Sequence, residues 1–113
     1  MTGSNLTSTC ARVLAYLEAC MMRGVRPDVM GARESAGPVC DMLWLDSLEE
    51  LRRKGFVACL EIVDTPGARL AVVDQARPTI EGEGWLASLS GRSLLPDPIA
   101  LAALVDATAR RAL

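Results

Sequence analysis

Apolar residues recur at steps of three and four along the first part of the chain, which is the spacing of one face of an α-helix. This stripe predicts a helix over residues 7 to 23, with Thr7 or Ser8 as its N-cap. Gly24 is the predicted stop. The apolar positions that form the buried face are Cys10, Val13, Leu14, Leu17 and Met21.

Glycine and proline interrupt the pattern over residues 24 to 40. A short helix over residues 28 to 35 is expected there, followed by a turn at Gly37. A third helix is predicted over residues 38 to 54, with Pro38 in its first position. Its expected inward positions are Val39 or Cys40, Trp44, Leu48 and Leu51.

The periodicity changes after Gly55, where β-prone residues begin. Residues 57 to 63 and 69 to 73 flank the turn-forming sequence Asp64-Thr65-Pro66-Gly67. This pattern predicts a two-stranded hairpin and no larger sheet. Thr79 is then the predicted N-cap of another helix, whose packed side would carry Ile80, Trp85, Leu86 and Leu89.

The last part of the chain is expected to form an alanine-rich helix over residues 97 to 113, with Asp97 as N-cap and Pro98 in the first position. Such a helix either folds back on its own domain or forms a homodimer with a second copy. Its broad apolar surface comprises Ile99, Ala102, Ala103, Leu104, Val105 and Thr108.

Three helices, a hairpin and a further helix, in this order, predict an α+β, mostly helical fold of the winged helix-turn-helix type, with a two-stranded hairpin as the wing and an extra C-terminal helix. The expected organisation is a flexible N-terminus at 1–6, a winged-helix domain at 7–89, a linker at 90–96 and the C-terminal helix at 97–113. A chain of 113 residues can bury one core but has no room for a separate catalytic domain.

Composition narrows the classes of function. The net charge of -2 gives no general attraction to polyanions. No histidine is present and there is only one lysine, Lys54, with no phosphate-binding glycine loop beside it, so we expect no enzyme and no cofactor. No apolar run approaches the roughly 18 residues that span a bilayer, and the N-terminus does not resemble a signal peptide, so a cytoplasmic location is expected.

The four cysteines are widely and irregularly spaced, with no C-x-x-C pair. We expect them to be small buried or half-buried thiols. An all-cysteine metal site or a redox pair is the alternative. The residues are Cys10, Cys20, Cys40 and Cys59.

The outer face of the predicted third helix decides most of the functional argument. It carries apolar and acidic residues but no basic ones, which favours contact with a protein, possibly a basic one, over reading of DNA. Simple packing of Met42 and Leu43 under the first helix is the alternative. The candidate partner-binding residues are Met42, Leu43, Asp46 and Glu50.

The competing function is that of a dimeric DNA-binding transcriptional regulator. Isolated arginines near the third helix and the hairpin could contact phosphates, although those at the end of the helix also suit its dipole. The candidate DNA-binding residues are Arg52, Arg53, Arg69 and Arg77.

Two local motifs carry a family resemblance. Leu51, Gly55, Phe56 and Val57 match the passage from a helix into a wing, and Thr79, Gly82, Trp85 and Leu86 match the start of the helix that follows it. In these motifs the chain resembles the small phage and bacterial winged-helix proteins of the YjcQ type and, more distantly, the MarR and PadR regulators. The resemblance implies a winged helix, and small acidic members of mobile elements often bind another protein; inhibitors of the anti-CRISPR type are one such group.

Overall fold

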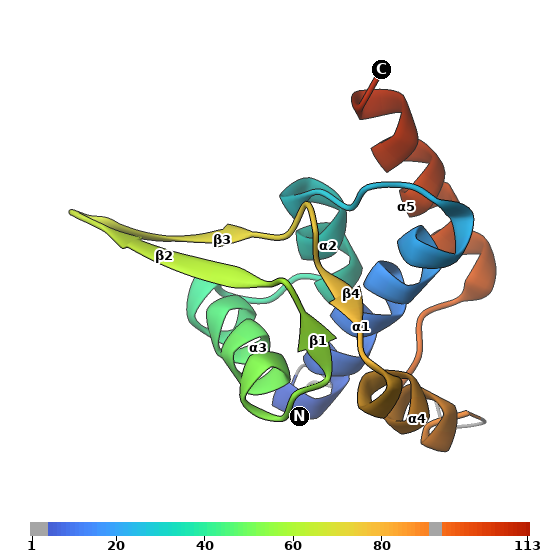
Figure 1. Cartoon of the computed structure of the whole chain (residues 1–113), viewed down its shortest axis with the longest axis horizontal. Coiled ribbons are helices and arrows are strands. Elements are labelled where there is room, and N and C mark those ends of the chain that lie inside the picture. Colours follow the sequence, from blue (N-terminus) through green and yellow to red (C-terminus); the bar gives the residue numbers. More distant parts are fainter. Residues whose placement is uncertain (1–4, 91–93) are drawn as a thin grey trace.

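The computed structural model describes residues 5–90 and 94–113 (Figure 1). The predicted α+β, mostly helical architecture is confirmed. The helices are α1 (Leu6–Arg23), α2 (Val29–Ala36), α3 (Asp41–Arg53), α4 (Ile80–Ser88) and α5 (Pro98–Arg111). The strands are β1 (Val57–Ala58), β2 (Glu61–Thr65), β3 (Ala68–Val72) and β4 (Arg77–Pro78). Residues 1–4 of the expected N-terminal segment and 91–93 of the expected linker lie outside the described residues.

Helix α1 is the centre of the fold, and α2, α3, α4 and α5 all pack against it. The N-cap prediction was wrong, because the cap is Asn5 rather than Thr7 or Ser8. The Asn5 side chain accepts the Ser8 backbone N–H at 2.9 Å, and Ser8 Oγ accepts the Asn5 N–H at 3.3 Å. This reciprocal capping box satisfies two unpaired donors at once. The stop at Gly24 is confirmed, with a left-handed φ of 67°.

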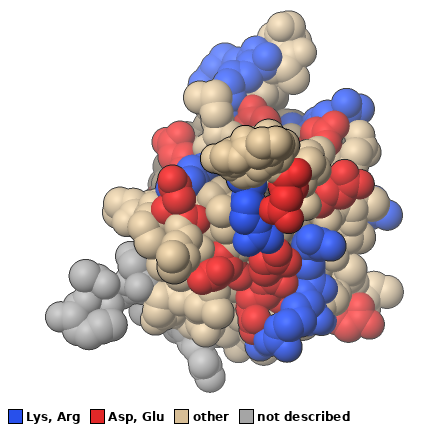
Figure 2. Space-filling view, turned by 90° about the vertical axis from the view of Figure 1, so that its left-hand side faces the viewer, with Lys and Arg blue, Asp and Glu red and all other residues tan. Residues whose placement is uncertain are grey.

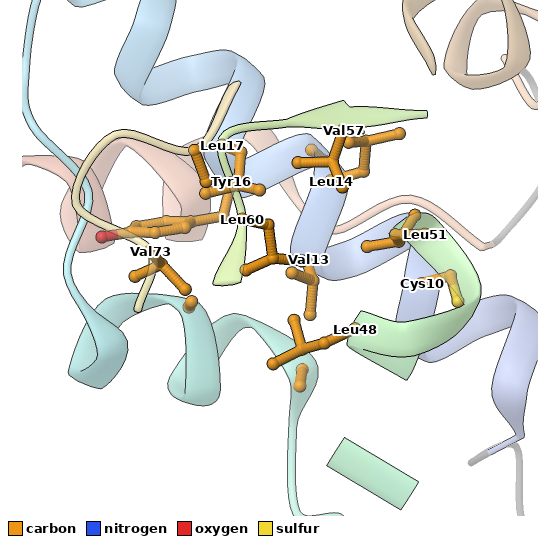
Figure 3. Close-up of a cluster of buried hydrophobic side chains, with 14 of the residues drawn as sticks. Cys10, Val13, Leu14, Tyr16, Leu17, Leu48, Leu51, Val57, Leu60 and Val73 are labelled. Atoms are coloured by element: carbon orange, nitrogen blue, oxygen red, sulfur yellow. The ribbon is translucent and has the colours of Figure 1, made fainter. Parts of the chain in front are cut away.

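Helix α3 begins later than predicted. Cys40 is its N-cap and Asp41 its first residue, so Pro38 does not open the helix. Gly37 has φ 88°, and its carbonyl accepts the Val39 N–H at 2.8 Å, which holds this segment in a tight turn. The inward positions of the helix are confirmed, because the core buries Trp44 together with Leu48 and Leu51 (Figure 3).

The strands form two separate two-stranded antiparallel sheets, β1–β4 and β2–β3. The hairpin prediction is confirmed in β2–β3, where Thr65 lies opposite Ala68 across the turn. The first predicted strand is interrupted, however, because Cys59 adopts φ 63° between β1 and β2. This kink turns Leu60 into the core beside Val73 (Figure 3). Beyond it, β2–β3 projects away from the helices (Figure 1).

Helix α4 packs closely on the segment before β1. Thr79 caps it as predicted, accepting the Gly82 N–H at 3.0 Å. A side chain at Gly82 would collide with the Phe56 backbone, so glycine permits this approach. The Phe56 and Trp85 rings stack with centroids 5.1 Å apart.

Helix α5 folds back onto α1 and α2, which is one of the two roles expected for it. Val105 and Thr108 are buried, and Thr108 Oγ1 lies 2.7 Å from Tyr16 Oη in α1. Arg111 forms an ion pair with Asp28, the N-cap of α2, at 2.8 Å. Burial raises the pKa of Tyr16 to about 12, so this hydroxyl stays protonated. Pairing with a second copy through the exposed side of α5 stays a prediction.

Two of the four cysteines depart from the prediction. Cys10 and Cys20 are buried, but Cys40 and Cys59 are exposed because one caps a helix and the other occupies a kink. Burial raises the pKa of the Cys10 thiol to about 12, which makes it unreactive. Within residues 5–90 and 94–113, no group of three or more His, Cys, Asp or Glu side chains could hold a metal ion.

Candidate protein-binding surface

Met42, Asp46 and Glu50 lie on one stripe of the outer face of α3, because each is four positions from the next, and Leu43 lies beside this stripe. Met42 is 73% exposed and Asp46 is exposed, whereas Leu43 and Glu50 are half-buried. Met42 therefore does not pack under α1. All four residues lie on α3, and the use of this face for binding stays a prediction.

The acidic edge of this stripe is already neutralised at one end. Arg53 donates three hydrogen bonds to the Glu50 carboxylate, at 2.8 to 3.1 Å, and Lys54 Nζ lies 3.5 Å from it. The hydrogen bonds from Arg53 come first among the causes that lower the pKa of Glu50. The four candidate residues include two carboxylates, Asp46 and Glu50. Of these, Asp46 has no ion pair among the described residues.

The predicted DNA-binding arginines are also largely paired with acids. Arg69 in β3 bridges to Glu49 on α3 at 2.6 Å and to Asp64 in β2 at 2.9 Å. Arg52 lies 3.8 Å from the same Glu49. The contacts of Arg69 join the hairpin to α3. In all of these contacts the arginine charge is paired with a carboxylate of the same chain. Figure 2, which faces the side from which the hairpin projects, shows basic and acidic side chains interleaved rather than a basic track.

Arg77 does not join this group. It lies in β4, at the base of the strands, and its Nη1 donates to Cys59 Sγ at 3.5 Å. It lines a different groove, together with Arg26 from the loop between α1 and α2. The structure therefore brings Arg52 and Arg69 to the same carboxylate, Glu49, and pairs Arg53 with the neighbouring Glu50, whereas Arg77 has no part in these ion pairs.

A groove between α2, α3 and β3 was not predicted from the sequence. We call it the hairpin groove. Its floor includes the nearly buried Trp44 ring, with the Arg33 guanidinium 5.5 Å from the ring centroid and paired with Asp41 at 2.7 Å. The lining residues used below are Val29, Arg33, Trp44, Leu45, Leu70 and Val72.

Large apolar side chains are exposed on the helices and the hairpin that border the hairpin groove, and Val29, Leu70 and Val72 line the groove itself. The hairpin alternates, so that Ile62 and Ala71 turn toward the body while the neighbouring positions face outward. Three of the outward strand positions, Val63, Leu70 and Val72, carry large apolar side chains that are exposed. Large apolar residues exposed on α2, the start of α3 and the hairpin are Val29, Met30, Met42, Val63, Leu70 and Val72.

Comparisons of the chain with protein-family models, with curated proteins and with solved structures find no match. Among the described helices, none is long and apolar enough to cross a membrane.

Proposed function

We propose that this chain is a noncatalytic winged-helix binding module that contacts a protein partner through the hairpin groove and the adjoining outer face of α3. The observation that carries the proposal is that the exposed apolar residues Val29, Leu70 and Val72 line this groove, with further exposed apolar residues on the same helices and hairpin. Contiguous exposed apolar surface on a small domain is typical of a protein-interaction site.

The form of the hairpin supports the proposal. A two-stranded hairpin is marginally stable alone, and β2–β3 is held to the body by the Arg69–Glu49 ion pair and by the buried residues at its base. Yet Leu70 remains 53% exposed. A partner that covers Leu70 and Val72 would bury apolar surface that folding alone leaves in water.

The charges of the same face favour a protein over DNA. DNA affinity depends on cations that can replace counterions at phosphates, and here Arg52, Arg53 and Arg69 are paired with carboxylates. Binding to a phosphate would have to compete with these contacts. The family resemblance suggests one kind of partner, a protein of a host complex, as for phage inhibitors of the anti-CRISPR type. Such a partner is part of what we propose. A dimeric DNA-binding regulator is the alternative outcome of the test.

The test compares variants of the tagged full-length protein in affinity capture followed by mass spectrometry. Leu70→Glu should lose a protein that the unmodified chain retains. Met22→Glu is the matched control, because Met22 is 76% exposed on α1 and does not line the hairpin groove. A gel shift with the DNA upstream of its own gene runs in parallel. A sequence-specific shift that Leu70→Glu leaves intact, with no protein captured, would favour the regulator.

A further inference from the structure

A second groove lies between α1, α4 and the start of α5. We call it the α4 groove. Its apolar wall is formed by Ala15 of α1, Leu86 of α4, and Leu95 and Leu101 on either side of the α5 N-terminus. The volume is about 330 Å³, which is room for a few side chains rather than for a whole domain.

Two carboxylates border this apolar wall from different helices. Glu18 comes from α1 and Glu83 from α4, and both are half-buried. Within the described part of the chain neither has an ion pair or a hydrogen bond through its side chain. Burial, and then the charge of Glu83, raise the pKa of Glu18, so that two negative charges lie near each other with no compensating cation among the described residues.

The contrast with the other half-buried glutamates is informative. Glu49 and Glu50 each have at least one arginine within ion-pair distance. The α4 groove instead combines apolar walls with uncompensated negative charge. A cation placed there would turn a repulsion into an attraction, and apolar neighbours of that cation would find apolar contacts.

We propose that the α4 groove binds a basic, partly apolar segment of a partner protein, with one arginine or lysine side chain between Glu18 and Glu83 and flanking apolar side chains on Leu86 and Leu101. This surface is separate from the hairpin groove, since the two share no lining residue. The module would then contact partners through two different surfaces.

The probe is a fluorescein-labelled synthetic peptide in which a single arginine stands between leucines, with serine and glycine spacers for solubility. Its affinity for the full-length protein is measured by fluorescence anisotropy at low and moderate salt. Glu18→Gln and Glu83→Gln should each weaken binding about threefold to tenfold, the range of a partly exposed charge contact. Higher salt should reduce this difference.

The matched control variant is Glu81→Gln, because Glu81 is an exposed acid on α4 that does not line the groove; it should bind like the unmodified protein. A peptide with glutamine in place of arginine should bind more weakly and should not distinguish the Gln variants. Circular dichroism verifies that all variants are folded.

Several results would overturn the proposal. One is that the arginine peptide fails to bind the unmodified protein, and another is that it binds the Glu18→Gln, Glu83→Gln double variant as tightly as the unmodified protein. A third such result is that Leu70→Glu, and not the glutamine variants, loses peptide binding. Equal affinity for free argininamide would show that a small cation, not a protein segment, is the occupant. Apart from the Leu70→Glu result, which would move the peptide site to the hairpin groove, these results do not bear on the capture experiment, so the two proposals can fail separately.

Discussion

Two surfaces of the molecule differ in whether their carboxylates are paired with cations. One is the hairpin face, by which we mean the hairpin groove together with the outer face of α3, and the other is the α4 groove. On α3, Glu49 and Glu50 each pair with an arginine, and large apolar residues are exposed on the same helix and on the hairpin. In the α4 groove, Glu18 and Glu83 lie beside apolar walls and have no ion pair within residues 5–90 and 94–113. The acidic residues of the sequence therefore do not form one acidic surface. The hairpin face offers apolar contact, whereas the α4 groove offers negative charge.

The largest effect on stability is expected from a substitution of Trp44, which tests whether the floor of the hairpin groove is part of the core. Trp44→Ala should lower the free energy of unfolding by about 3 to 5 kcal/mol, because the ring is only 4% exposed and its removal leaves a cavity. Urea denaturation measures this. Met42→Ala on the same helix is the control, with an expected loss within about 0.5 kcal/mol because its side chain is exposed. A loss below about 1 kcal/mol for Trp44→Ala would place the ring at the surface.

Charge reversal on α3 separates the two candidate ligands of the hairpin face. The double variant Asp46→Lys, Glu50→Lys should weaken a protein partner several-fold, mainly by slowing association in a salt-dependent way. The same variant should strengthen binding if DNA is the ligand, because it also releases Arg53 from Glu50. Stopped-flow association rates at two salt concentrations measure the first effect and gel shifts the second. If neither ligand responds, this part of α3 is not in the interface.

A smaller effect tests the link between the hairpin and α3. Glu49→Gln removes a carboxylate that contacts both Arg69 and Arg52, and should cost about 0.5 to 1 kcal/mol of stability, as for a partly exposed ion-pair network. Faster amide hydrogen exchange in β2 and β3 should accompany the loss, with little change in α5. Unchanged exchange in the hairpin would show that Arg69 does not hold it to the body.

The smallest effect concerns the α4 groove. Since burial and Glu83 raise the pKa of Glu18 in the folded protein, its ionised form is less favourable there than in the unfolded chain. Glu18→Gln should therefore stabilise the protein at pH 7 by a few tenths of a kcal/mol, about the size of a like-charge pair. The gain should disappear as the pH falls below 4.5, the ordinary value for glutamate. A gain that is independent of pH would exclude charge as the cause.

Local sequence signals predicted much of the fold. The period of the apolar residues located the helices, and Gly24, Thr79 and Asp97 marked helix boundaries that the structure confirms. One error concerned packing, because Ile80, expected on the packed side of α4, is 85% exposed. Two errors in helix boundaries came from competing local interactions. Asn5 and Ser8 satisfy each other in a capping box, and the Gly37 turn keeps Pro38 outside α3.

The candidate sites were less predictable because they depend on contacts between distant parts of the chain. Helical spacing placed Met42 and Asp46 on one face, but nothing local shows that Arg69 reaches Glu49, which lies 20 positions earlier. The hairpin groove needs α2, α3 and β3 together, and the α4 groove needs α1, α4 and α5. Only the outward apolar residues of the strands could have been recognised from their alternation.

Site-specific photocrosslinking in cells tests the proposed contact surface most directly. A photoreactive amino acid replaces Leu70 or Met42 at the hairpin face, and Met22 at the control position, all three being exposed. The proposed function predicts a discrete protein adduct from Leu70 and Met42 after illumination, and none from Met22. Adducts with DNA, or no adduct at either hairpin-face position, would contradict it.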